Sequence, residues 1–270
     1  MQSRDKTFYY QASASPLGGQ MEQPFLRPIP SPASSALSAA GGFASSQSEA
    51  FNHENIVSFT AAHTRISGHE APHGGREAPD GKEFSTLVTT VVEGLNILEI
   101  VTAKRVVAQL SVAFPKDGGP RRIATAGSYF EGLRIGGYDA EPQPNKALLR
   151  SPLTVEGIQG IGVEQSKALA DKVSGLTARY GWTRREQKGN AALTMCSLLN
   201  AVSPKLPGRS FGHVIAIPDF GRIFLGELLV SHGFAQLSMV RAELGCNVHA
   251  TLTVSVAGSG GTTMPPGRSF

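Results

Sequence analysis

The stretch from Phe211 to Gly258 constrains the fold more strongly than any other part of the chain. It contains four runs rich in apolar residues, separated by short clusters of turn-forming residues such as Pro218-Asp219 and His232-Gly233. Apolar runs joined by such short turns are typical of an antiparallel meander. The pattern predicts a mainly β protein, built as an antiparallel β-sandwich or flattened barrel.

Composition agrees with one large β body. A chain of 270 residues with 40% hydrophobic content can bury a sizeable core. The 31 glycines and the low charged content of 17% suit many tight turns between strands. The net charge of +4 is too small to indicate a nucleic-acid partner by itself.

The N-terminal residues lack the apolar core of a secretory signal, and no run of 18 apolar residues could form a membrane-spanning helix. We therefore expect a cytoplasmic protein without a membrane partner. In that compartment Cys196 and Cys246 are expected to be reduced thiols rather than a disulfide.

The order of patterns predicts the organisation of the chain. We expect residues 1–50 to form an N-terminal arm with one short strand, Thr7 to Ala14, before a loop rich in Pro, Ser, Ala and Gly from Pro24 to Ser48. Residues 51–270 are expected to form a single β domain. In Lys104 to Phe114, apolar residues at even positions predict a strand, and the turn Pro115 to Pro120 predicts that the chain returns antiparallel.

Residues 146–190 lack β alternation and are predicted to be a helical insertion. Their apolar residues recur at spacings of about three and four, as an amphipathic helix requires: Val163, Leu169, Ala170, Val173 and Leu176. The next apolar run, Leu193 to Val202, is compatible with a buried strand or a helical turn.

Turn lengths in the meander predict a register. If His232-Gly233 is a two-residue turn, Arg222 faces Glu243, and a three-residue loop at 245–247 sets Glu243 opposite His249. This gives a structural polar row of Arg222, Glu243 and His249, on the face that carries Phe224, Met239 and Ile215. The opposite face is the predicted core: Ile223, Leu225, Leu229, Val240, Ala242, Ala250, Leu252 and Val254.

Several phrases of the chain resemble a family of uncharacterised bacterial proteins. They are FYYQAS near the start, SFTAAHTRISG at residues 58–68, VEGLNILEIVTAKRVVAQL at 92–110, GSYFEGLRIGG at 127–137, and GHVIAIPDFGRIFLGELLV with MVRAELG later. The resemblance implies no function, since none is known for the family. The region from Ile217 to Val256 is also distantly similar to β-rich repeats of bacterial surface proteins.

One segment of the insertion resembles a helix-hairpin-helix element, in which glycines let backbone N–H groups approach a phosphate. Its candidate residues are Gly160, Ile161 and Gly162. Aromatic and basic residues follow, which could stack on bases and follow a nucleic-acid backbone: Arg179, Trp182, Arg184, Arg185 and Lys188. The competing interpretation is a plain capped helix with a solvated basic end.

Three other groups of residues have side chains that could form a chemical site. His63, His69 and His73 are spaced like metal ligands, but they lie at a strand end and in a Gly/Pro-rich loop, so we expect no metal. Glu227 and Glu243 could pair as the carboxylates of a glycosidase, although the register places them on opposite faces. Cys196 lies among apolar residues and is expected in the core.

The chain has no Walker loop and no strand-linked GxGxxG motif, so no nucleotide cofactor is expected. By elimination, the sequence favours a non-enzymatic interaction or assembly protein that associates with other proteins, above all with itself. The alternatives are a nucleic-acid-binding protein acting through the insertion and a carbohydrate-active β-sandwich hydrolase.

Overall fold

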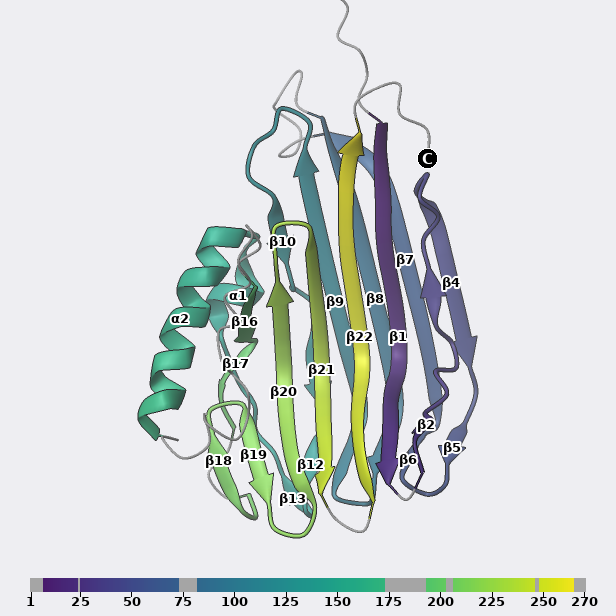
Figure 1. Cartoon of the computed structure of the whole chain (residues 1–270), viewed down its shortest axis with the longest axis vertical. Coiled ribbons are helices and arrows are strands. Elements are labelled where there is room, and N and C mark those ends of the chain that lie inside the picture. The colour runs from purple at the N-terminus through teal and green to yellow at the C-terminus, as the bar shows by residue number, and fades with distance from the viewer. Residues whose placement is uncertain are drawn as a thin grey trace, which may run out of the picture.

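The chain folds into two layers of long antiparallel strands that pack face to face, as the computed structural model shows (Figure 1). The structure describes residues 7–23, 25–72, 82–172, 193–202, 206–245 and 248–264. No helix within these ranges is long and apolar enough to cross a membrane. The predicted fold class, a mainly β sandwich or flattened barrel, is confirmed.

The layer nearer the viewer in Figure 1, here called the front sheet, contains the C-terminal meander and the N-terminal strand side by side. Its order is β18 (Arg209–Phe211), β19 (Val214–Ile217), β20 (Gly221–Val230), β21 (Phe234–Gly245), β22 (His249–Met264), β1 (Thr7–Gln23) and β2 (Arg27–Pro28), with β16 (Thr194–Ser197) beside β20 and β3 (Ser35–Ala36) beside β1.

The other layer, the back sheet, is centred on β8 (Lys82–Ile97) and β9 (Val101–Pro115). Beyond β8 lie β7 (Ala61–Pro72), β4 (Gly42–Ser48), β6 (Val57–Phe59) and β5 (Phe51–His53); beyond β9 lie β10 (Arg122–Ala124), β11 (Tyr129–Glu131), β12 (Arg134–Ile135), β13 (Tyr138–Asp139) and β15 (Leu153–Thr154). A separate pair joins β14 (Gln143–Pro144) to β17 (Leu199–Ala201).

Two helices, α1 (Lys146–Arg150) and α2 (Val155–Lys172), lie in the predicted insertion, at the side of the sandwich next to β16 (Figure 1). The apolar residues that α2 buries differ from those predicted. Val163 is 52% exposed, whereas Val155 and Ile158 are buried in the core. The predicted residues Val173 and Leu176 lie outside the described residues. In the run from 193 to 202 the strand alternative is the correct one.

The core lies between the two sheets. Partway along each long strand of the front sheet, the residues that face the core change between odd and even numbers, which is called the parity change here. In the front sheet the ladder skips one residue on each of four neighbouring strands at the same level: Gly226, Met239, Ser255 and Pro16. Gly226 and Ser255 have positive φ values of 65° and 53°. Such irregularities exchange the two faces of a strand, because side chains otherwise alternate with a period of two.

The parity change decides which meander residues face the core. Ile223, Leu225, Val240, Ala242, Ala250, Leu252 and Val254 are buried there, as predicted. Leu229 is only half-buried, because after Gly226 the inward positions are Leu228 and Val230. Met239 and Ile215, which were predicted on the other face, also belong to the core.

Buried hydroxyl groups connect the two sheets near the level of the parity change. Ser255 Oγ accepts a hydrogen bond from Ala108 N at 3.1 Å and donates one to Thr90 O at 2.9 Å. Thr90 Oγ1 in turn donates to Val256 O at 2.9 Å. These bonds satisfy backbone groups between the layers and hold the sheets in one relative position.

The N-terminal part of the chain is integrated into the sandwich. The strand predicted to end at Ala14 continues to Gln23, because β1 pairs with β22 along its whole length. The segment predicted as a loop connects the front sheet to the back sheet and contains β2, β3 and β4. Ser35 Oγ donates to Thr64 Oγ1 at 2.8 Å, which ties β3 to β7 in the opposite layer.

Candidate functional site

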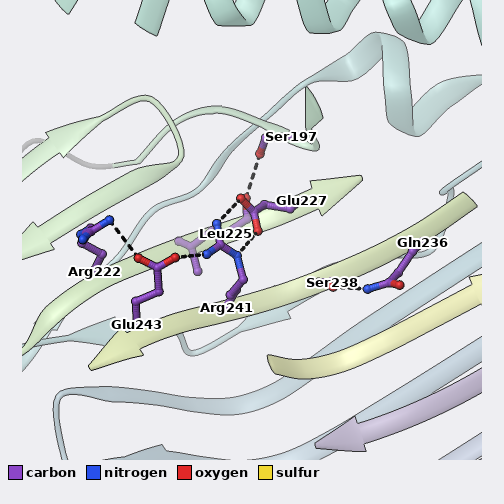
Figure 2. A network of polar contacts seen from close by, with 8 residues as sticks. All are labelled: Ser197, Arg222, Leu225, Glu227, Gln236, Ser238, Arg241 and Glu243. Carbon is purple, nitrogen blue, oxygen red and sulfur yellow. Dashed lines mark hydrogen bonds and ion pairs between the residues drawn. The ribbon is translucent and has the colours of Figure 1, made fainter. Parts of the chain in front are cut away.

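A network of polar side chains on the front sheet joins β20 to β21 (Figure 2). Arg241 Nε and Nη2 donate to the two carboxylate oxygens of Glu227 at 2.7 and 2.9 Å. The side chain of Glu227 is only 6% exposed and that of Arg241 is 22% exposed. A bidentate pair of this kind fixes both side chains in one geometry.

Glu243 extends the network toward the start of β20. It accepts from Arg241 Nη1 through one oxygen, and its other oxygen lies 2.9 Å from Arg222 Nη1. The guanidinium carbon of Arg241 lies 3.6 Å from the centre of the Phe224 ring. Burial opposes the charge of Arg241, but the hydrogen bonds and charges of Glu227 and Glu243 outweigh burial and raise the pKa of Arg241.

The two carboxylates therefore lie on the same face of the front sheet, and the expectation that they lie on opposite faces was wrong. The reason is the parity change at Gly226, which turns Glu227 to the outer face that Glu243 already shares. The guanidinium of Arg241 lies between the carboxylates and donates to both. It therefore occupies the space that a glycosidic oxygen would need between an acid and a base.

The predicted polar row is observed in its first two members. Arg222 faces Glu243, as the two-residue turn predicts. Glu243 faces Thr251 rather than His249, and His249 faces Gly245. The loop between β21 and β22 thus begins one residue later than predicted, which moves every partner on β22 by two residues.

The glycines of the helix-hairpin-helix-like motif lie inside α2, well after its first residue Val155. Backbone N–H groups at such positions are donated within the helix and do not point at a ligand. A Cβ at Gly162 would lie 2.7 Å from Thr194 Cγ2, so this glycine lets α2 approach β16 closely. At Gly160 a Cβ would meet no atom within 4 Å.

The aromatic and basic residues that were candidates to act with this motif lie outside the described residues: Arg179, Trp182, Arg184, Arg185 and Lys188. The histidines whose spacing resembles that of metal ligands, for which no metal was expected, are also not brought together. His63 and His69 lie six residues apart on β7, about 20 Å along an extended strand, and His73 lies outside the described ranges. Within those ranges no three His, Cys, Asp or Glu side chains are grouped to hold a metal ion.

Two buried groups near β20 could carry chemistry but lie in closed surroundings. Burial raises the pKa of the Cys196 thiol to about 12, so it is a poor nucleophile at neutral pH. Burial and then the charge of Arg241 lower the pKa of His213 to about 4. Both side chains are at most 3% exposed, so they contribute to packing rather than to an open site.

The edges of the two sheets are protected unequally. At β16 the side chain of Gln165 on α2 reproduces a strand partner, because its Oε1 accepts from Ser197 N at 2.7 Å and its Nε2 donates to Ser197 O at 2.9 Å. Ser197 Oγ donates to Leu225 O at 2.8 Å on the other side (Figure 2). The helical insertion thus covers this edge of the front sheet.

The opposite side of the molecule ends in β4, a strand of seven residues whose only partner among the described strands is β7 (Figure 1). Among the described residues, no backbone hydrogen bond joins β4 to any other strand. Its sequence, GFASSQS, contains no charged residue and no proline. Natural edge strands are normally blunted by lysine, proline, a bulge or short length.

Sequence reasoning missed this edge, because the segment is poor in large apolar residues. The side chains of β4 that point outward share a face with alternate residues of β7: Phe43 faces Ser67, Ser45 faces Arg65 and Gln47 faces His63. Phe43 is 58% exposed, and Arg65 stacks against its ring at 5.2 Å. The sequence GFASSQS has no alternation of apolar and polar residues that could have identified a strand.

Comparison with known proteins gives a family but no activity. No curated protein and no solved structure matches the chain. A family model described as a domain of unknown function, DUF8256, matches residues 8–231, which include nearly all of β1, the whole of β20 and every described strand of the back sheet. This match covers most of the sequence, and the chain therefore belongs to the DUF8256 family.

Proposed function

We propose that the protein is a non-enzymatic interaction or assembly protein, and that its partner adds a β-strand to the free edge of β4. One observation carries the proposal: β4 is seven residues long, has no charged side chain, and pairs with a described strand on one side only. In strand addition, main-chain hydrogen bonds supply affinity and alternate side chains supply specificity. A seven-residue edge offers a partner a ladder about 24 Å long.

Other edges of the described sheets are less suitable for this role. The terminal strands β2, β3 and β13 have two residues each, and β5 and β18 have three. The four residues of β16 are covered by Gln165 and α2. β4 is therefore the longest described strand that has a partner on one side only.

Hydrogen exchange tests the proposal directly. The probe is a synthetic peptide that copies residues 62–68 of β7, since that sequence already pairs with β4 on its other side. At low protein concentration, outward-facing amides of β4 should exchange rapidly, and the peptide should slow their exchange. The combined substitutions Ser45→Lys and Gln47→Lys should abolish this protection, because both side chains are exposed and lysine blunts an edge.

The double substitution Gln11→Lys/Ser13→Lys is the matched control, since it adds the same two charges at exposed strand positions of the front sheet. It should leave the protection of β4 unchanged. The proposal fails if the β4 amides exchange as slowly as those of the central strand β8 in the free monomer. It also fails if the peptide protects the control and the lysine variants equally.

A further inference from the structure

We infer that the strand added to β4 is the β4 of a second copy of this chain, paired antiparallel about a two-fold axis at Ser45. This inference rests on the proposed function, because it names the occupant of the same edge. A two-fold interface uses the same surface of both molecules, so the edge must be complementary to itself. Three conditions follow from this: two copies of β4 must not repel each other by charge, their residues must pair in register, and the pairing must end at two copies. β4 meets all three.

Charge is the first condition. β4 contains no ionisable side chain, so two copies place no like charges opposite each other. A partner of different chemistry would normally be selected by opposite charges, which this edge does not offer. The nearest charged group on the same face, Arg65, lies on the neighbouring strand and is stacked on Phe43. Two Arg65 side chains in the pair would be separated by three strand spacings, about 14 Å.

Register is the second condition. In a two-fold antiparallel pair, residue numbers that face each other have a constant sum. That sum must be even, because otherwise an outward side chain would face an inward one. A sum of 90 pairs all seven residues from Gly42 to Ser48, whereas any other even sum leaves residues unpaired. Ser45 then faces Ser45 of the second copy, and Phe43 faces Gln47.

Closure is the third condition. Once two β4 strands have paired, each is an interior strand and the free edge no longer exists. The assembly therefore stops at two copies, whereas a free edge that accepted strands in open succession would lead to aggregation. The pairing would join the two back sheets into one continuous antiparallel sheet. An interface limited to one ladder is small, so we expect association in roughly the micromolar range.

Sedimentation velocity over a series of protein concentrations tests the inference. The wild-type chain should pass from monomer to dimer, and Ser45→Lys and Ser45→Glu should each weaken dimerisation about tenfold or more, because identical charges then face each other. An equimolar mixture of the two variants should regain the dimer, since opposite charges then meet at the axis. Gln11→Lys, which lies on the other sheet, should dimerise like the wild type.

The possible outcomes separate the inference from the proposal that it rests on. A wild-type chain that stays monomeric at all concentrations overturns self-pairing, while protection of β4 by the β7-copy peptide would leave strand addition intact. If the peptide also fails, both fall together. A dimer that persists in the separate Ser45 variants, or that the mixture does not restore, places the interface elsewhere and overturns the inference. Each variant is checked against the wild-type urea midpoint to confirm that it is folded.

Discussion

Replacing Arg241 by leucine should destabilise the protein more than replacing Arg222 by leucine in the same polar network of the front sheet. The substitution removes both hydrogen bonds to Glu227, whose side chain is only 6% exposed. The carboxylate would then be buried without a cation. Breaking a buried ion pair on one side typically costs about 3–5 kcal/mol, because one charge loses its compensation.

We expect a loss of about 3 kcal/mol, at the lower end of that range, because the Arg241 side chain retains 22% exposure and water can reach part of the site. Equilibrium unfolding in urea, followed by circular dichroism, should show a midpoint lower by roughly 1 M. Arg222→Leu is the matched control. It removes a partner of Glu243, with both side chains 31% exposed, and should cost at most about 1 kcal/mol.

The double variant Arg241→Leu/Glu227→Leu distinguishes an unpaired charge from lost packing. Leucine at both positions removes the buried charge together with its partner, so most of the lost stability should return. The reasoning is refuted if Arg241→Leu costs no more than Arg222→Leu. It is also refuted if the double variant is as unstable as the sum of the two single changes.

Three further predictions follow from packing and ionisation. Gly162→Ala should lower the free energy of unfolding by about 1–3 kcal/mol, because the added methyl group would lie 2.7 Å from a side-chain carbon of Thr194 on β16. Gly160→Ala in the same helix should be neutral or stabilising in the same urea assay, since its methyl group would meet no atom within 4 Å. The pKa of His213 is about 4 in the folded protein against 6.5 for the free side chain. The free energy of unfolding of the wild type should therefore fall by about 3 kcal/mol as the pH is lowered from 6.5 to 4, because the unfolded state binds the proton first. Urea unfolding of His213→Asn should not show this loss. In a Cys246→Ser background, Cys196, with a pKa of about 12, should resist a disulfide reagent at pH 8 until the protein is unfolded, and rapid labelling of the folded protein would contradict its burial.

The register of the β20–β21 hairpin could be predicted from the sequence because a turn of known length fixes it. His232-Gly233 sets the sum of facing residues, and Arg222 faces Glu243 accordingly. The next connection could not be fixed in this way, since loops of three residues are compatible with more than one starting point. His249 is therefore displaced by two positions from its predicted partner.

The faces of the meander could be predicted only up to the level of the parity change. Leu225 and Leu229 have the same parity and both are apolar, so the sequence offers no reason to place them on different faces. Gly226 was the available signal, because an isolated glycine inside a strand often marks a bulge. The same omission separated Glu227 from Glu243, which Arg241 in fact joins.

The strand β4 could not be predicted from hydrophobicity, since GFASSQS has one large apolar residue. Its strand conformation comes from tertiary pairing with β7 along all seven residues, and context of this kind overrides local propensity. The basis of the proposed function was therefore invisible in a segment that the composition describes as a loop. Only the topology shows that the segment ends the back sheet.

Two other edges of the sandwich are covered by specific contacts, whereas β4 has no charged residue or proline to block another strand. On the side of the insertion, a helix that can approach only because of Gly162 brings Gln165 to bond both backbone groups of Ser197. On the side of β1, residues 33–41 return over the strand and tie Thr64 to the opposite layer. Both devices satisfy or cover backbone groups that would otherwise accept another strand. Within the described residues, two edges are covered by such specific contacts and the longest edge carries neither charge nor proline, which supports the proposal that another strand occupies it.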